Sequence, residues 1–466
     1  MTGFHKILAN SLIAGITNAT VWFAVTFWTF LETRSVFATG MIAGSHLVLT
    51  AMSGMWFGSL VDHHPKKYVM LGSSLASFLL YLVALAVHLS VPERAFTDVG
   101  SVPLWLFILP AMLGVIAGNV RAIALPTLVT AMIPADRRDK ANGLVGMVGG
   151  VGFLVTSAMS GYLVAKTGMT GTMGFALVLT FVAFVHLLFV RFDMLPEAAA
   201  AKDGAAETRD GAQDYAAAEA APAAPKVPKR VDIRGTILVI GAVPGLFALI
   251  FFACFNNMLG GVFMALMDAY GLSLMKVEQW GLLWAFLSCA FILSGMVIAK
   301  IGLGPKPLRT LLLVNLISWA AAALFTVQSS ILLLTAGCFI FLFFGPFAEA
   351  AEHTTLQKVV PYERQGRVFG FAQSVELAAS PLTAFLIGPL TQFLFIPFMT
   401  DGAGADAIGD WYGRGPERGI ALVFTVAGLF GVALTLFAFG SKYYRQLSAA
   451  AGTDKADGAA PAANLG

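Results

Sequence analysis

Charged residues are scarce in this sequence. Asp, Glu, Lys and Arg together make up 12% of its 466 residues, whereas hydrophobic residues make up 58%. A water-soluble domain carries roughly twice that charged fraction. Apolar stretches of about 20 residues recur along the chain and predict membrane-spanning helices. The composition therefore excludes an ordinary soluble protein and indicates an all-α polytopic membrane protein.

Cysteine is also rare, since Cys254, Cys289 and Cys338 are the only three, and all lie in apolar runs without metal-type spacing. We interpret them as small buried hydrophobic residues and expect no metal site. The chain lacks a phosphate-binding loop, which excludes ATP as its fuel, and it shows no nucleophile–base pair. We therefore expect no enzyme activity and no cofactor.

Twelve transmembrane helices are predicted. Their approximate ranges are 7–30, 36–61, 68–90, 103–133, 141–165, 173–192, 236–265, 279–299, 310–326, 331–359, 368–395 and 419–441. The first run lacks a short core followed by an A-x-A site, so we expect a permanent helix there and not a signal peptide. An even number of spans places both termini on one side of the membrane.

The distribution of basic residues predicts which side that is. The connections on the terminal side, together with Lys6, hold 14 Lys and Arg, whereas the opposite loops hold six. Basic residues concentrate in cytoplasmic loops. We therefore expect a multi-pass protein of the inner or plasma membrane with cytoplasmic termini.

The chain divides into two similar halves. Residues 194–234 are rich in Ala, Pro and charge and predict a flexible cytoplasmic linker between six-helix bundles at 1–193 and 235–445, with a disordered tail at 446–466. A short pattern repeats after spans four and ten. Its matching positions are Pro134, Asp136, Arg137, Lys140 and Gly143, and then Pro361, Glu363, Arg364, Arg367 and Gly370. Duplicated halves are typical of carriers that bind substrate near the midplane and expose it to each side in turn.

The loop "GSLVDHHPKK" after span two resembles the signature of the major facilitator superfamily, G-x-L-x-D-R-x-G-R-K/R. The matching residues are Gly58, Leu60, Asp62, Lys66 and Lys67, whereas His63 and Pro65 depart from the usual Arg and Gly. The resemblance implies the fold of that superfamily, two pseudo-symmetric six-helix bundles. It also implies a cytoplasmic gate, for which the candidates are Gly58, Asp62, Lys66, Lys67, Arg137, Lys140, Arg364 and Arg367. Asp62 could there meet a neighbouring helix N-terminus or a base. The alternative is a basic loop that only follows the positive-inside rule.

Two further stretches bear on the direction of transport. Gly143, Gly152 and Gly161 in span five lie in register with a glycine pattern associated with exporters, although Thr156, Ser157 and Ser160 replace its Gly-Pro-Gly. Ordinary close helix packing is the alternative explanation. The second half, from Thr354 onward, resembles the branch with macrolide and siderophore efflux permeases. That resemblance implies export without naming a substrate.

Four formally charged residues fall well inside the spans: Arg121, Glu349, Glu352 and Glu376. A charge at a helix centre costs about 2.5–3.5 kcal/mol on insertion scales, so such residues must pair, face water or be neutral. The superfamily lines its cavity with spans one, four, seven and ten. From their heights along spans four and ten, we expect Arg121 to face Glu349 and Glu352 across the two halves.

Several roles for these charges stay open. One glutamate could take up and release a proton while Arg121 tunes its proton affinity, or Arg121 and a glutamate could form a permanent interdomain salt bridge. Direct binding of a cationic substrate is a third possibility. His353 shares a helical face with Glu349 and Glu352 and could assist. Glu376 is a second proton candidate, with a gate contact as its alternative.

Polar and aromatic residues of spans one and seven are candidates for the substrate site. They are Asn18, Trp22, Phe255, Asn256 and Asn257, and each could instead serve helix–helix contacts. We predict a monomeric secondary transporter that uses the proton gradient to export a hydrophobic or amphipathic small molecule by alternating access. Its expected partners are that molecule, protons and the lipid bilayer, with no nucleic acid. A proton-coupled importer and a non-transporting membrane sensor are the alternatives.

Overall fold

The computed structural model describes residues 2–33, 36–192, 194–195 and 232–451, and every regular element within these ranges is a helix. The N-terminal half contains α1 (Thr2–Thr33), α2 (Val36–His63), α3 (Lys66–Ser90), η1 (Glu93–Phe96), α4 (Val102–Gly118), α5 (Val120–Met132), η2 (Ala135–Arg137) and α6 (Arg138–Phe189). Asn119 separates α4 from α5 within the fourth span. Gly168, at φ 64°, breaks the long α6 into the fifth and sixth spans.

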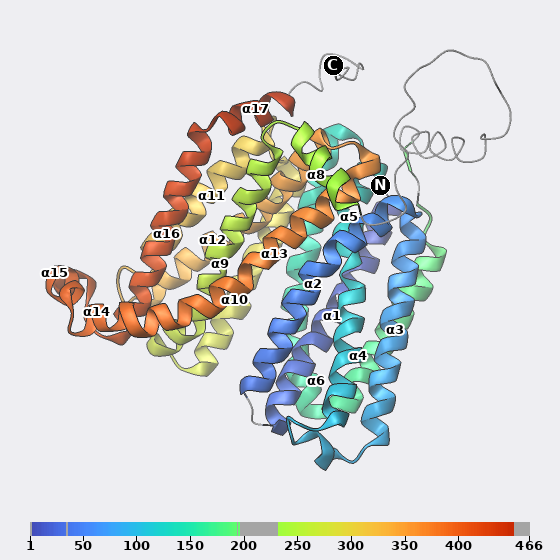
Figure 1. Ribbon diagram of the computed structural model, residues 1–466, viewed down its shortest axis with the longest axis horizontal. Coiled ribbons are helices and arrows are strands. Elements are labelled where there is room, and N and C mark those ends of the chain that lie inside the picture. The colour runs from blue at the N-terminus through green and yellow to red at the C-terminus, as the bar shows by residue number, and fades with distance from the viewer. Residues whose placement is uncertain (1, 34–35, 193, 196–231, 452–466) are drawn as a thin grey trace.

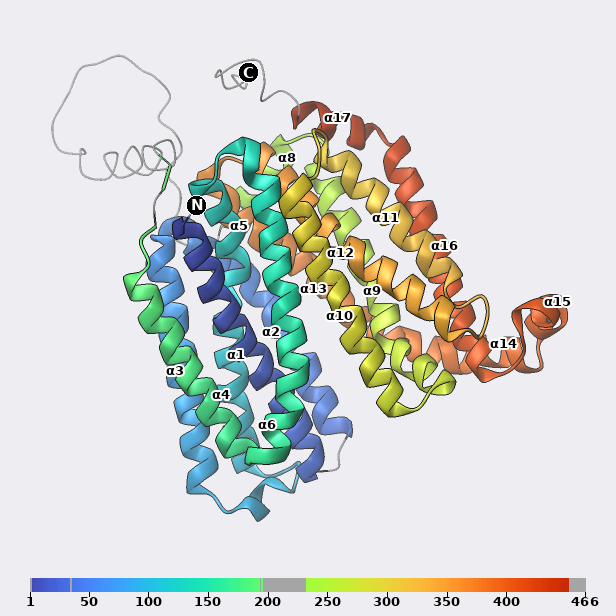
Figure 2. The same ribbon diagram turned by 180° about the vertical axis from the view of Figure 1, so that it is seen from behind.

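The C-terminal half contains α8 (Ile233–Ala242), α9 (Leu246–Leu274), α10 (Val277–Ile301), α11 (Pro307–Leu324), α12 (Ile331–Val359), η3 (Tyr362–Arg364), α13 (Gln365–Leu390), η4 (Thr391–Phe395), α14 (Ile396–Thr400), α15 (Ala403–Tyr412), α16 (Pro416–Gly440) and α17 (Lys442–Ala450). The connection between α14 and the last span, α16, thus contains a helix of its own, α15. In both views α15 lies at the outer edge of this half (Figures 1 and 2), away from the other half.

The predicted twelve-span, two-bundle fold is confirmed. Nine helices of the described chain are long and apolar enough to cross a membrane. The remaining three expected spans coincide with α2, the first part of α6, and α13.

Three boundaries differ from the prediction. Span seven, predicted at 236–265, runs instead as α9 to Leu274, because Gly245 at φ 87° separates a short α8 from it. The linker predicted at 194–234 overlaps the start of α8 at Ile233, and residues 196–231 of it lie outside the described residues. The predicted disordered tail begins inside α17, which continues to Ala450. Residues 452–466 of that tail also lie outside the described chain.

The two halves meet at one end only. Figures 1 and 2 show the helices lying together where α1 begins and α17 lies, and diverging toward the opposite end. We call the first of these the terminal end. One hydrophobic core there contains residues of both halves, such as Phe57, Val61, Ile298 and Val368. Toward the other end the core splits into one cluster within residues 21–177 and another within 259–427. The structure is therefore closed at the terminal end and open at the other.

Tight helix–helix packing joins the two halves at the terminal end. A Cβ atom on Gly58 of α2 would meet the carbonyl oxygen of Gly366 on α13, and one on Gly143 of α6 would meet the side chain of Ile298 on α10. Gly143 thus packs across the two halves, whereas a Cβ on Gly161 would have no atom within 4 Å. Glycine at such positions lets two backbones approach where any side chain would separate them. The contacts of α2 with α13, and of α6 with α10, hold the halves together.

Candidate functional site

Two glutamates from adjacent helices form a carboxyl pair. Glu352 on α12 and Glu376 on α13 are both half-buried, and their carboxyl groups are close enough to act on each other. An ionised carboxylate can only accept hydrogen bonds, so the two groups can share a hydrogen bond only when one of them carries a proton. Two neighbouring carboxylates also repel each other when both are ionised. The arrangement therefore favours a state in which one of the two carboxyl groups is protonated.

Glu349 and His353 extend this pair along α12. Glu349 lies one turn from Glu352, is solvent-exposed, and is close enough for its charge to act on both members of the pair. The ring of His353 packs edge-on against Phe369 of α13, with 5.3 Å between the ring centroids. The α12 residues that the sequence grouped together thus share the side that faces α13.

Arg121 does not face the glutamates. Its guanidinium donates hydrogen bonds to Ser74 Oγ at 2.6 Å, Ser73 Oγ at 3.3 Å and Asn10 Oδ1 at 3.5 Å, all within the N-terminal half. The residue is only 8% exposed. The prediction that Arg121 lies opposite Glu349 and Glu352 is therefore wrong for this structure. Height along a helix gave no information about which way the side chain points.

Within the described ranges, none of the ion pairs of 4.0 Å or less involves Glu349, Glu352 or Glu376. The three carboxyl groups must therefore be protonated, face water or bind a ligand. Glu376 lies beside Glu352, and among the described residues it has no hydrogen bond or ion pair to the gate, which was its alternative assignment.

We call the contacts that close the terminal end the terminal-end gate, and Asp62 lies at their centre. The backbone N–H groups of Gly366 and Arg367, in the first turn of α13, donate to its carboxylate at 2.7 and 2.9 Å. These N–H groups have no partner within their own helix, and the positive end of the helix dipole favours an anion there. Arg367 adds an ion pair, with 3.6 Å between Nε and Asp62 Oδ2. Asp62 thus ties the end of α2 to the start of α13.

Further contacts across the gate were not predicted. Asn142 of α6 donates to Thr354 and Gln357 of α12 at 2.9 Å, and the backbone N–H of Leu303 donates to Asp139 at 2.9 Å. His63, noted only as a departure from the signature, lies 3.2 Å from Arg367. Polar residues of loops and helix ends are common in any membrane protein, so no sequence pattern singled these out.

The gate lysines serve the structure in different ways. Lys66 donates to the carbonyl of Val61 and places its ammonium 4.6 Å from the ring centre of Tyr362. Burial, reinforced by the carboxylates of Asp62 and Glu363, raises the pKa of the Tyr362 hydroxyl, so the ring stays neutral beneath the cation. Lys67 donates to the carbonyls of Leu188 and Val190.

The remaining predicted gate residues do not enter this cluster. Arg137 is exposed and pairs with its neighbour Asp136 at 3.6 Å. Lys140 is exposed near Gly302, and Arg364 caps α13 and lines a small cavity beside α8. Their predicted role as gate residues therefore has no direct support from contacts with Asp62.

The substrate-site candidates fall into two groups. Asn18 accepts a hydrogen bond from Tyr81 at 2.8 Å, Asn256 accepts one from Trp319 at 2.6 Å, and Trp22 stacks on His46 with 4.1 Å between ring centroids. These three serve helix–helix contacts within their own halves. Phe255 and Asn257 remain exposed on α9.

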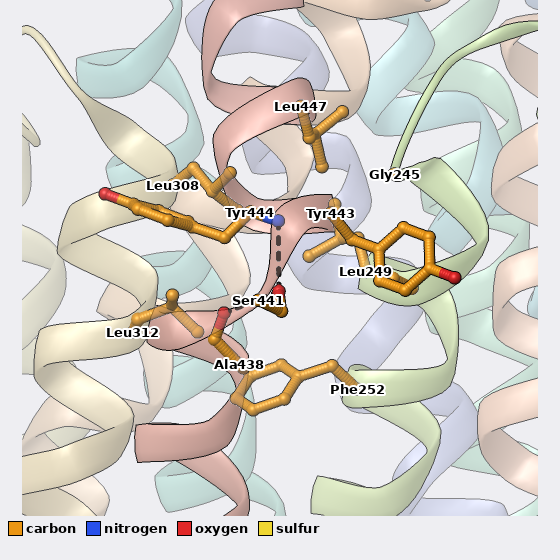
Figure 3. Close-up of a pocket in the computed structure, with 11 residues that line it drawn as sticks. Gly245, Leu249, Phe252, Leu308, Leu312, Ala438, Ser441, Tyr443, Tyr444 and Leu447 are labelled. Atoms are coloured by element: carbon orange, nitrogen blue, oxygen red, sulfur yellow. Dashed lines mark hydrogen bonds between the residues drawn. The ribbon is translucent and has the colours of Figure 1, made fainter.

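A cavity elsewhere is too small to hold a substrate. It lies between α9, α11 and the α16–α17 junction and is lined by apolar side chains and two tyrosines (Figure 3). Its volume of about 40 Å³ is close to that of one or two water molecules. None of the predicted site residues lines it.

Two related six-helix halves, joined at one end and open at the other, define a multi-pass membrane carrier. A sequence profile of the Major Facilitator Superfamily matches residues 7–384. The chain therefore belongs to the major facilitator superfamily, as its loop signature suggested.

Individual relatives are distant. The chain is 21% identical over 196 residues to macrolide efflux protein A of Streptococcus pyogenes, an alignment that covers 41% of this chain and 45% of that protein. The fold is similar to that of the proton:xylose symporter XylE, with a TM-score of 0.63, 14% identity, and 94% and 96% of the two chains covered. It is also similar to a bacterial homologue of the iron transporter ferroportin, with a TM-score of 0.62, 13% identity, and 95% and 100% covered.

Proposed function

We propose that this protein is a proton-coupled antiporter that exports a hydrophobic or amphipathic small molecule from the cell. The observation that carries the proposal is the pair of neighbouring, half-buried carboxyl groups of Glu352 and Glu376, which forms no ion pair with a basic residue in the described chain. The partial similarity to a macrolide efflux protein supports export as the direction. The 38 Phe and 18 Met residues favour adaptable apolar walls, which suit amphipathic substrates.

The proposed cycle follows from the uptake and release of a proton at the Glu352–Glu376 pair. With the basic terminal end in the cytoplasm, the closed gate leaves the glutamates accessible from outside, where they take up a proton. When the halves rock to the other conformation, the pair faces the cytoplasm. Substrate binding there removes the proton, and the loaded carrier returns outward. Each turn of the cycle moves at least one proton inward for each molecule exported.

This proposal can be tested by transport into everted vesicles with an imposed pH gradient, using a panel of amphipathic compounds that includes a macrolide. We expect Glu352→Gln and Glu376→Gln to abolish gradient-driven transport, because a glutamine cannot release a proton. Exchange of labelled for unlabelled substrate without a gradient should persist in these variants. The matched control is Glu93→Gln, at an exposed position in η1.

The outcomes separate the alternatives. Full gradient-driven activity in both variants and in the double variant would exclude the pair from coupling. Loss of exchange as well would assign the glutamates to substrate binding and not to coupling. Accumulation of the compounds in intact wild-type cells would favour the importer, and no transport of any compound would favour a sensor.

A further inference from the structure

His63 lies where α2 meets the other half of the molecule. Its Nδ1 is 2.7 Å from the carbonyl oxygen of Ser59, one turn earlier, and its Nε2 is 3.2 Å from Nη2 of Arg367 on α13. Arg367 is buried and also pairs with Asp62. Ser59 Oγ also lies 3.3 Å from Nδ1. The shortest contact of Nδ1 is thus with a group that can only accept a hydrogen bond, and Nε2 faces one that can only donate.

These two contacts fix the protonation state of His63 in the closed gate. A carbonyl oxygen only accepts, so Nδ1 must carry a hydrogen. A guanidinium only donates, so Nε2 must offer its lone pair. The closed gate thus requires the neutral ring with its hydrogen on Nδ1. A second proton, on Nε2, would remove the hydrogen bond that Nε2 accepts from Arg367. The Nε2–H group and the guanidinium N–H would then face each other, and both side chains would be positively charged.

The charged groups joined to the His63–Arg367 contact bear on what a proton on His63 does. Asp62 of α2 and Asp232, the N-cap residue of α8, both pair with Arg367, while Lys66 of α3 acts on Asp62, and Tyr362 and Glu363 lie in η3. Burial raises the pKa of the Asp62 carboxyl to about 7 and keeps the Tyr362 hydroxyl neutral by raising its pKa. A proton on Nε2 of His63 adds one positive charge beside the buried Arg367, whatever the charge of Asp62.

We propose that His63 is a proton-binding site whose occupation opens the terminal-end gate. A proton on Nε2 places an N–H group against the Arg367 guanidinium, so the contact between α2 and α13 is lost. On the orientation proposed above, protons from the cytoplasm open the gate toward the cytoplasm. This site lies apart from the Glu352–Glu376 pair, and it requires neither a particular substrate nor a direction of transport.

The neighbouring residue provides a matched control. His64 is exposed, and its Nδ1 lies 3.3 Å from the carbonyl oxygen of Leu60 on its own helix. A His64→Gln variant therefore removes an imidazole from the same loop without touching this contact to α13. His63→Gln keeps an oxygen that can accept from Arg367 but lacks the titrating ring.

The experiment measures gate opening by the distance between two spin labels. Exposed positions Ala135 and Lys306 lie in the connections of the two halves at this end, and the three native cysteines are first replaced by serine. The full-length protein is titrated between about pH 8 and 5.

We expect the long-distance population to rise on acidification in the wild type and in the control His64→Gln. We expect no such rise in His63→Gln. His63→Asn is a second variant without a titrating ring, should the glutamine variant fail to fold. A wild-type distance that does not change with pH would overturn the proposal. The same titration curve in wild type and His63→Gln would also overturn it, and would assign the response to Asp62.

Discussion

Closure of the terminal end depends on glycine at position 58, and replacing it should shift the protein toward the conformation that is open there. In the closed structure, a Cβ atom on Gly58 would overlap the carbonyl oxygen of Gly366 and lie 3.0 Å from the Cα atom of Arg367. Both neighbours are backbone atoms at the start of α13, which Asp62 holds in place. Neither can rotate away as a side chain would, so α2 and α13 must move apart.

The magnitude follows from the cost of overpacking. Forcing an extra carbon into a closely packed contact costs about 1–3 kcal/mol. Alanine also favours the helix over glycine by about 1 kcal/mol, but α2 remains helical in both conformations, so this gain cancels in their ratio. A cost of about 2 kcal/mol reduces the ratio of closed to open molecules by roughly 30-fold. Gly58→Val should have a larger effect than Gly58→Ala.

The assay is the distance between spin labels at Ala135 and Lys306, measured at one fixed pH for all variants. Gly44→Ala is the control on the same helix, since a Cβ at that position would meet no atom within 4 Å. We expect a longer distance in Gly58→Ala and an unchanged one in Gly44→Ala. If Gly58→Ala and Gly58→Val both kept the wild-type distance distribution, the close contact would not control closure, and the reasoning would be refuted.

Two further changes test the charged groups. Asp62→Asn should open the same gate, because an amide NH₂ would face a backbone N–H that now donates to a carboxylate, at a cost of about 1.5–3 kcal/mol; an unchanged label distance would contradict this. Ser74→Ala should lower thermal stability, since it removes the 2.6 Å hydrogen bond of buried Arg121 and costs about 1–3 kcal/mol. This is measured as the unfolding temperature in detergent. The control is Ser90→Ala, at an exposed position on the same helix. An equal decrease of the unfolding temperature in both variants would refute a special role for the hydrogen bond to Arg121.

The fold was predictable because few solutions exist for a chain of this composition. Long apolar runs in lipid must form helices, and the repeat at Pro134 and Pro361 indicated two related halves. Glu349, Glu352 and His353 were placed on one helical face from their spacing alone, and the structure places them near α13. Periodicity within one helix is a local property, and the sequence carries it directly.

The partners of these residues were not predictable in the same way. Arg121 and the glutamates have similar heights, but the rotation of α5 about its axis turns the guanidinium toward Ser73 and Ser74. That rotation depends on packing among several helices, and a single sequence does not specify it. The hydroxyl groups of Ser73 and Ser74, with Asn10, accept hydrogen bonds from the guanidinium in place of the expected carboxylates. His63 was visible as a departure from the signature, but its meaning depends on Arg367, which lies 304 residues later.

The position of Glu376 explains how one helix can connect the proton pair with the gate. Glu376 and Arg367 lie on α13, nine residues apart, which corresponds to about 14 Å along the helix axis. The first turn of the same helix donates to Asp62, and its side contacts α2 through Gly370 and Gly54. A change of charge on the Glu352–Glu376 pair would alter the contact between α12 and α13. Because α13 runs without a break between the two sites, we expect a movement at Glu376 to displace its first turn relative to Asp62. The N-terminal half, whose buried Arg121 is held by neutral groups, has no equivalent connection among the contacts described.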